Sequence, residues 1–409
     1  MSIVNQNTQV TAGSNGVETP SCYSKQSLGQ LLRNNLGFLP VLFTLIIIAV
    51  FFQITTHGLF LTPRNLTQLI LQITTIGTLG LGVVLVLLLG EIDLSVAAVA
   101  TLCSVVMGML SERLGYPAWI AISAAIATGA MIGFINGFFI AYLRVPSFIV
   151  TLAASISYSG LLIYLLQGQA TLIINNDFII GLANNYQTGS LVGIGLPVLV
   201  LTLYIAGTLS TNYQRRKMHL TPSSSLRMAA TIGTPVLIVI AALVLFHAYL
   251  GVPQALLILA SLILLCWLLL TKTPYGRHVY AVGGNTEAAR RAGIHVVGIR
   301  ITIFTLCSTL AAIAGILATS RASAVASQIN PTLLLQAIAA AVIGGVSLFG
   351  GRGSVWSIVL GALIIGSLGN GLDLNNQPVE IKQMIEGAVL LLAVTSDALI
   401  RRAQTRTGR

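Results

Sequence analysis

Acidic side chains are the first residues in this sequence that could do chemistry, because the chain has few of them. Only 10 of its 409 residues are Asp or Glu, and Glu91 and Asp93 follow directly after the apolar run 81–89. Next to Ser95, these carboxyl groups could relay a proton, cap the following helix or line a polar path. We expect capping to be part of their role, since a break between two apolar helices exposes backbone groups that need partners.

The elements around these acids are those of a membrane protein. Hydrophobic residues make up 55% of the chain and charged residues 8%, and uncharged stretches of about 20 residues, long enough to cross a bilayer, recur from Phe38 onward. The runs 41–52 and 256–270 lack the alternation of a β-barrel strand. We therefore expect an all-α fold, a polytopic α-helical integral membrane protein with about 10–12 transmembrane helices. The expected crossings are 38–57, 66–90, 95–111, 118–143, 147–168, 190–210, 229–249, 255–271, 300–320, 333–348, 355–372 and 381–398.

Basic residues set the expected orientation. Placing both termini in the cytoplasm leaves only Arg64, Arg113, Arg321 and Lys382 outside, in agreement with the positive-inside rule. The breaks at 91–95 and 349–354 are either loops or re-entrant hairpins, so the helix count stays between the two limits. Three domains follow: a polar, disordered cytoplasmic tail at 1–36, a transmembrane domain at 37–398 with a cytoplasmic loop at 272–299, and a basic cytoplasmic tail at 399–409.

The cytoplasmic loop at 272–299 contains a second motif. Its sequence predicts a turn at Gly283–Asn285, an N-cap at Thr286, a short helix from Glu287 to Arg291, and Gly293 just past the helix end. A rigid helix carried between two membrane spans suits contact with a soluble partner. The alternative is an ordinary solvated, charged loop.

These residues resemble the EAA signature of bacterial ABC-importer permeases, whose short cytoplasmic helix docks on an ATPase subunit. The segments 91–96, 145–152, 343–347 and 350–354 also match, in order, the branch of that family that imports ribose, xylose and galactose. The additional section 191–270 is most similar to the xylose subfamily. The resemblance implies ATPase coupling for Gly283, Gly284, Asn285, Glu287, Ala288, Ala289 and Gly293.

The resemblance implies a non-enzymatic permease subunit that moves a monosaccharide, D-xylose or a ribose- or galactose-like sugar, across the bacterial inner membrane. Its implied partners are a cytoplasmic ATP-binding subunit, a periplasmic sugar-binding protein, a second copy of the chain and membrane lipid. A separate subunit must hydrolyse ATP, because none of the four lysines follows a phosphate-binding GxxxxG pattern. We expect no cofactor, metal or catalytic residue in this chain, and no nucleic-acid partner despite its net charge of +11.

Two alternatives remain beside the permease reading. The chain could be a proton-coupled secondary transporter that uses Glu91 and Asp93, or a membrane-embedded enzyme, although no His, Asp and Glu cluster falls in the expected spans. We expect the glycines at 129, 133, 137, 361 and 366 to allow close helix packing. The residues predicted to line the path or break the helices are Glu91, Asp93, Ser95, Asn136, Gly353, Ser354 and Asn370.

Overall fold

The computed structural model describes residues 39–188, 193–218 and 225–406. The predicted tail at 1–36 and the last three residues of the predicted tail at 399–409 lie outside this part. The chain divides into two compact units, Met1–Leu39 and Pro40–Arg409. The second unit contains the helices that are long and apolar enough to cross a membrane.

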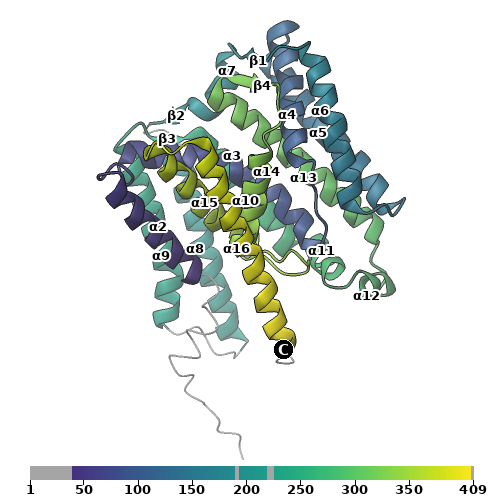
Figure 1. Ribbon diagram of the computed structural model, residues 1–409. Coiled ribbons are helices and arrows are strands. Elements are labelled where there is room, and N and C mark those ends of the chain that lie inside the picture. The colour runs from purple at the N-terminus through teal and green to yellow at the C-terminus, as the bar shows by residue number, and fades with distance from the viewer. Residues whose placement is uncertain (1–38, 189–192, 219–224, 407–409) are drawn as a thin grey trace, which may run out of the picture. The chain divides into compact units, whose positions relative to one another are not determined.

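Long helices form this unit, as the continuous apolar runs predict (Figure 1). They are α2 (Leu39–Thr55), α3 (Pro63–Leu88), α4 (Val96–Gly108) with the π-helical turn η1 (Met109–Arg113), α5 (Ala118–Ala141), α6 (Ser147–Leu166), α7 (Asp177–Asn184), α8 (Gly195–Lys217), α9 (Ser225–His247), α10 (Gln254–Lys272), α11 (Pro274–Gly284), α12 (Thr286–Arg291), α13 (Val296–Ala322), α14 (Pro331–Ile343), α15 (Ser357–Leu374) and α16 (Val379–Arg406).

Within the described ranges, seven helical segments are long and apolar enough to cross a membrane: α3, α4 with η1, α5, α6, α10, α13 and α15. The chain is thus a polytopic α-helical membrane protein, and the predicted fold class is confirmed. Every predicted crossing overlaps a helix within its described residues, although several bounds differ by a few residues and α16 runs eight residues further, to Arg406 rather than 398. The total of 10 to 12 crossings and the cytoplasmic placement of both termini stay predictions.

The packing around α13 depends on glycine. On α5, Gly129, Gly133 and Gly137 recur every four residues and face α13; a Cβ atom on Gly133 would lie 2.4 Å from the Phe304 carbonyl oxygen. Close backbone approach of this kind is how membrane helices pack without a hydrophobic driving force. Glycine 361 faces α14 in the same way, with Ala340 as its neighbour. The predicted packing role of these glycines is confirmed.

Short strands tie the connecting segments together at one end of the bundle. Strand β1 (Thr171–Ile173) pairs antiparallel with β4 (Ala324–Ala326), and β2 (Tyr186–Gln187) pairs antiparallel with β3 (Val252–Pro253). In Figure 1, β1, β4 and α7 lie at the opposite end of the bundle from α12. The two ends therefore carry different structures, a strand-bound cap and a projecting loop.

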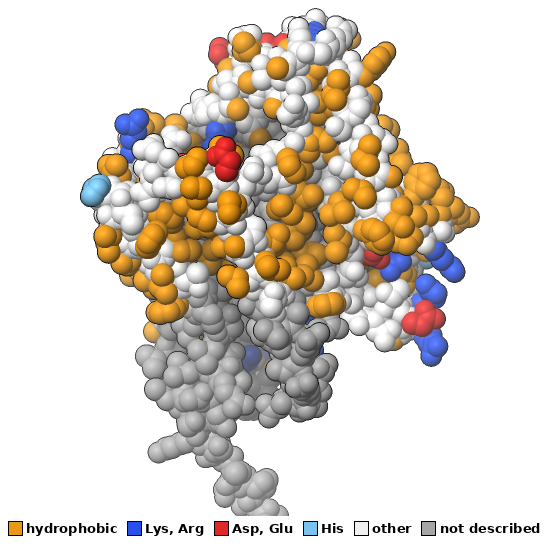
Figure 2. Space-filling model, in the orientation of Figure 1, with side chains coloured by type: hydrophobic (Ala, Val, Ile, Leu, Met, Phe, Trp, Pro, Cys, Tyr) orange, Lys and Arg blue, Asp and Glu red, His pale blue; other side chains and the backbone are white. Residues whose placement is uncertain are grey.

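The surface agrees with a membrane environment. Hydrophobic side chains cover much of the face in Figure 2, whereas acidic and basic side chains gather over α12. Large exposed apolar residues include Phe43 on α2, Phe134 on α5 and Ile156 on α6. Exposed apolar side chains of this size are expected where a helix faces lipid rather than water.

Candidate functional site

The chain breaks between α3 and α4, at residues 89–95, and Asp93 closes this first break. Its Oδ1 atom accepts hydrogen bonds from the backbone N–H of Ser95 at 2.8 Å and from the Ser95 hydroxyl at 2.6 Å. Asp93 is only 4% exposed, and Ser95 makes no side-chain cap bond to the helix. The expected capping therefore comes from Asp93 and not from Ser95.

Helix α6 supplies the remaining partners of the first break. The Ser147 hydroxyl accepts from the N–H of Ile92 at 3.5 Å, and the Thr151 hydroxyl accepts from the N–H of Leu94 at 3.1 Å. Irregular backbone inside a membrane protein is tolerated where protein groups satisfy it. The matching segment 145–152 thus holds the break at 91–96 in place.

Asn136 joins this network from α5. Its Nδ2 atom donates to the Ser95 hydroxyl at 3.3 Å, and its Oδ1 atom accepts from the Tyr158 hydroxyl at 3.4 Å. Asn136 is 2% exposed. A buried amide with both ends bonded fixes α5 and α6 relative to the first break.

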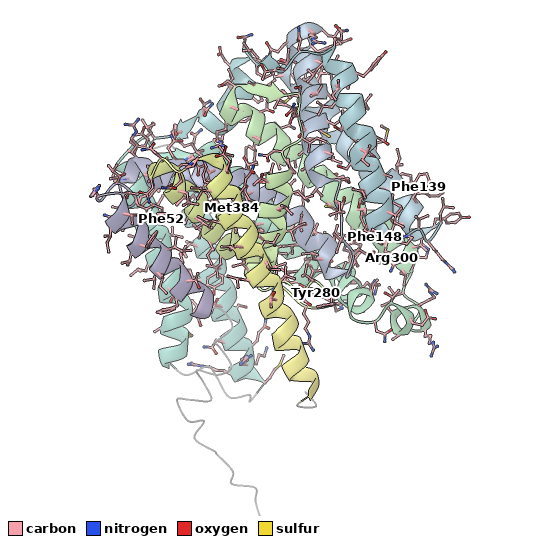
Figure 3. The ribbon with its side chains drawn as sticks, viewed as in Figure 1. Phe52, Phe139, Phe148, Tyr280, Arg300 and Met384 are labelled. Carbon is pink, nitrogen blue, oxygen red and sulfur yellow. The ribbon has the colours of Figure 1, made fainter. Side chains whose placement is uncertain are left out.

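Glu91 has a charged partner in Arg300, the residue that directly follows the 272–299 loop. Arg300 Nη2 lies 2.9 Å from Glu91 Oε1, and the side chains are 22% and 16% exposed respectively. Arg300 lies near the start of α13, at the end of the bundle that carries α11 and α12 (Figure 3). One end of the 272–299 loop is thus bound to the first break.

The second break, residues 344–356 between α14 and α15, is bound to the other end of the same loop. The Tyr280 hydroxyl on α11 donates to the Gly353 carbonyl at 3.0 Å, and burial raises the pKa of Tyr280, which keeps that hydroxyl protonated. Ser354 accepts from the N–H of Trp356 at 3.3 Å, so it begins the turn that leads into α15. Figure 3 shows Tyr280 at the end of the bundle that carries α11 and α12.

Glycines bring the two breaks and the loop into backbone contact. The Gly351 N–H donates to the Leu88 carbonyl at 2.9 Å. A Cβ atom on Gly283 would lie 1.8 Å from that same carbonyl oxygen, and one on Gly350 would lie 2.7 Å from the carbonyl oxygen of Gly283 and from the N–H nitrogen of Gly90. We call this meeting point the glycine junction: Gly90, Gly283, Gly350 and Gly351.

Helix α12 has a different N-cap from the one that the sequence predicts. The Asn285 side chain accepts from the Ala288 N–H at 2.9 Å, while the Thr286 hydroxyl turns back to donate to the Val282 carbonyl at 3.0 Å. Gly283 and Gly284 close α11 and do not form a free turn. The extended backbone of Asn285 decides this, because it aims the side chain at the first turn of α12. Gly293 has φ of 82°, as expected just past the helix end.

Only one side of α12 is covered. Ala289 is 4% exposed, whereas Ala288 on the same turn is exposed. Glu287 and Arg290 form an exposed ion pair at 3.3 Å. The helix therefore presents a small, charged and rigid surface that nothing in the described chain covers.

Asn370 lies apart from the two breaks. Its Oδ1 atom accepts from Asn65 Nδ2 at 2.8 Å, and Asn370 is 4% exposed. The bond ties α15 to the start of α3. Of the seven predicted path or break residues, Asp93, Ser95 and Asn136 meet in one network. Glu91 joins the first break to α13, and Gly353 and Ser354 belong to the second break. Asn370 belongs to neither break.

A cavity with polar groups on its walls, which we call the polar cavity, lies elsewhere. It measures about 540 Å³, is partly open, and is lined by residues of α3, α4, α13, β4, α14, α15 and α16. None of the seven predicted residues lines it. Polar residues on its walls include Gln72, Thr75, Gln336 and Glu386; each stands in an apolar helical run, a signal from which the sequence could have suggested the cavity.

The family described as branched-chain amino acid transport system / permease component matches residues 65–394. The chain belongs to this family of transport permeases. The xylose transport system permease protein of Haemophilus influenzae is 37% identical over 367 residues, which cover 89% of this chain and 96% of that protein. The ribose import permease protein of Escherichia coli K12 is 31% identical over 338 residues, 83% of this chain and 87% of that protein. No solved structure matches the chain.

The two breaks are relevant to transport by a permease of this family. A transport permease needs at least two arrangements of its helices, and the first and second breaks are places where helices can tilt without losing an internal hydrogen-bond ladder. The 272–299 loop is bonded to the second break through Tyr280, and Arg300, which follows the loop, is bonded to the first. Sequence reasoning named both breaks and the loop but could not reveal that they touch.

Proposed function

We propose that this permease is the membrane-spanning subunit of an ATP-binding-cassette importer that carries a monosaccharide across the bacterial inner membrane. The family description mentions branched-chain amino acids. However, the named relatives are permeases for xylose, ribose and, at 29% identity over 377 residues, fructose in Rhizobium meliloti. Relatives of nearly full length favour a sugar, with D-xylose first.

The observation that carries the proposal is the way in which α12 is attached to the two breaks. The helix projects an exposed Glu287–Arg290 surface. The loop that holds it is bonded to the second break through Tyr280, and the residue after the loop, Arg300, is bonded to the first break. A soluble ATPase that binds α12 can thus displace the backbone at both breaks at the same time. ATP binding and hydrolysis belong to that separate subunit, and this chain acts without an enzyme activity or cofactor of its own.

The other partners follow from the two ends of the bundle. A periplasmic sugar-binding protein would dock at the end with β1, β4 and α7, opposite α12 (Figure 1). Exposed apolar side chains on α2, α5 and α6 supply surface for lipid and for a second copy of the chain in a homodimer. We propose no nucleic-acid partner, since the basic residues follow the positive-inside pattern.

Proton-coupled transport through Glu91 and Asp93 is the competing function. A relay needs carboxyl groups that are free to exchange protons with water. Glu91 is instead held by Arg300, and one oxygen of Asp93 is occupied by two hydrogen bonds from Ser95. These contacts favour structural roles for both acids, and hence ATP as the energy source.

Replacement of α12 residues tests the docking. Glu287→Ala removes an exposed acid that makes no buried contact, and Gly293→Val places a β-branched residue at a φ of 82°. We expect each change to lower sugar uptake at least about tenfold while membrane levels stay unchanged. The measurement is uptake in cells that also contain the ATPase and binding protein, with ATP hydrolysis in isolated membranes alongside.

Gly160→Ala serves as the control, because a Cβ atom there meets nothing within 4 Å. It should transport at the wild-type rate. Normal uptake by both α12 variants would remove the docking assignment.

A further inference from the structure

The polar cavity runs from the β4 end of the bundle toward the first break. Its walls include β4 and the last turn of α13 at one end, and Ala100 and Thr101 at the other. Thr101 lies less than two turns inside α4, which begins just after Ser95. The cavity thus reaches into the membrane domain from the end opposite α12. That is the direction a solute takes when it enters from outside.

The walls of the cavity are suited to an uncharged, hydrogen-bonding solute. Four charged residues line it, Arg321, Lys382, Asp373 and Glu386, and their formal charges cancel. Lys382 and Asp373 form an ion pair, and the Gln336 amide donates to Glu386 Oε1 at 2.8 Å. A balanced lining exerts no net attraction on anions or cations. Amide and carboxylate groups, in contrast, can bond the donors and acceptors of a polyol.

Two polar atoms on the walls lack a hydrogen-bond partner among the described residues: Thr75 Oγ1 and Glu386 Oε2. Thr75 is only 6% exposed. Its neighbour Thr74 is different, because the Thr74 hydroxyl donates to the Leu71 carbonyl at 2.7 Å. Buried polar atoms without partners are uncommon in folded proteins and need a reason. Both atoms belong to residues that line the same cavity.

We propose that this cavity is a monosaccharide-binding site on the transport path, in which Thr75, Gln336 and Glu386 hydrogen-bond to sugar hydroxyl groups. The inference rests on the proposed function and adds the site to it. The volume of about 540 Å³ lies within the usual range for small-molecule sites. In this structure Glu386 Oε2 and Thr75 Oγ1 expose almost no surface, so each bonds a sugar hydroxyl once the helices that line the cavity have moved apart.

The sharpest test compares two adjacent threonines. Thr75→Val removes a hydroxyl without a partner and keeps the shape of the side chain, so the thermal midpoint should not fall. Purified permease, ATPase and binding protein are reconstituted together in proteoliposomes, and uptake of D-xylose is measured. We expect Thr75→Val to lower the turnover of D-xylose about twofold to tenfold, the effect of one hydrogen bond. ATP hydrolysis stimulated by the loaded binding protein should persist. Thr74→Val should transport like the wild type.

A second pair of variants tests the charged carboxylate of Glu386. Glu386→Gln keeps size and removes a strong acceptor, and should lower D-xylose turnover at least about tenfold. Glu380→Gln is its control on α16, exposed and outside the cavity lining. Half-saturation should stay constant throughout, since the binding protein sets the affinity for external sugar.

Wild-type turnover in both Thr75→Val and Glu386→Gln would overturn the cavity as a sugar site while leaving the proposed importer intact. A wild-type transporter that moves L-leucine but no D-xylose would overturn the proposed sugar function and this inference with it. The two failures are therefore distinguishable in one set of vesicles.

Discussion

At the scale of single residues, the ion pair between Glu91 and Arg300 joins the first break to α13. Both side chains are largely buried, so removing one charge leaves the other poorly solvated. We predict that Glu91→Gln and Arg300→Gln each destabilise the protein, and that the double variant loses less than the sum of the two. The coupling free energy should be about 1 kcal/mol, since the pair keeps some contact with water. Thermal unfolding of the four proteins in detergent measures it, and strictly additive losses would show that the two charges do not interact.

The sequence revealed these acids but not their partners. Glu91 and Asp93 stood out because acids are rare beside apolar runs. Glu91 pairs with Arg300, while Ser147 and Asn136 bond the neighbouring Ile92 N–H and Ser95 hydroxyl. All three partners are far away in the chain. Local patterns cannot supply such pairs, because they depend on how helices pack. The N-cap of α12 failed for a local reason: Asn285 and Thr286 are both good caps, and only backbone geometry chooses between them.

At the scale of elements, the glycine junction brings α11 into backbone contact with the two breaks. A Cβ atom on Gly283 would lie 1.8 Å from the Leu88 carbonyl oxygen, so Gly283→Ala must push α11 away from α3. We predict a destabilisation of about 1–3 kcal/mol, as for overpacking elsewhere, and a loss of sugar uptake larger than the loss of ATP hydrolysis. Thermal unfolding and paired uptake and hydrolysis assays in membranes check both parts.

Gly160→Ala on α6 is again the matched control, with open space around its Cβ position. Equal stability and uptake in the two alanine variants would mean that the junction does not couple the loop to the breaks.

Hydropathy was sufficient to predict the helices, because a segment that spans lipid must satisfy its backbone internally. It did not predict the short β1–β4 and β2–β3 pairs, whose strands have two or three residues and lie far apart in sequence. Nor did it reveal the polar cavity, which is shared by six helices and one strand. Features made within one helix were predictable, whereas of the features made between helices only the close packing at the glycines of α5 and α15 was.

At the scale of the whole molecule, the proposed docking of a soluble ATPase requires α12 to lie in the cytoplasm. The described native cysteines Cys103, Cys266 and Cys307 are buried. Once the fourth cysteine, Cys22, is replaced by serine, a cysteine added at the exposed Ala288 can report its own side. We predict that a membrane-impermeant maleimide labels Ala288→Cys in inside-out vesicles but not in intact spheroplasts. Phe178→Cys on α7, also exposed, should give the opposite result. Labelling of Ala288→Cys from outside would invert the proposed orientation.

The energy source is the most direct test of the central claim. Proteoliposomes containing the permease, its ATPase and the binding protein are given D-xylose with ATP, and vesicles containing the permease by itself are given D-xylose with a pH difference. We predict that sugar accumulates only with ATP and the partner subunits, and that collapsing the pH difference changes nothing. Accumulation by the permease alone, driven by the pH difference, would contradict it.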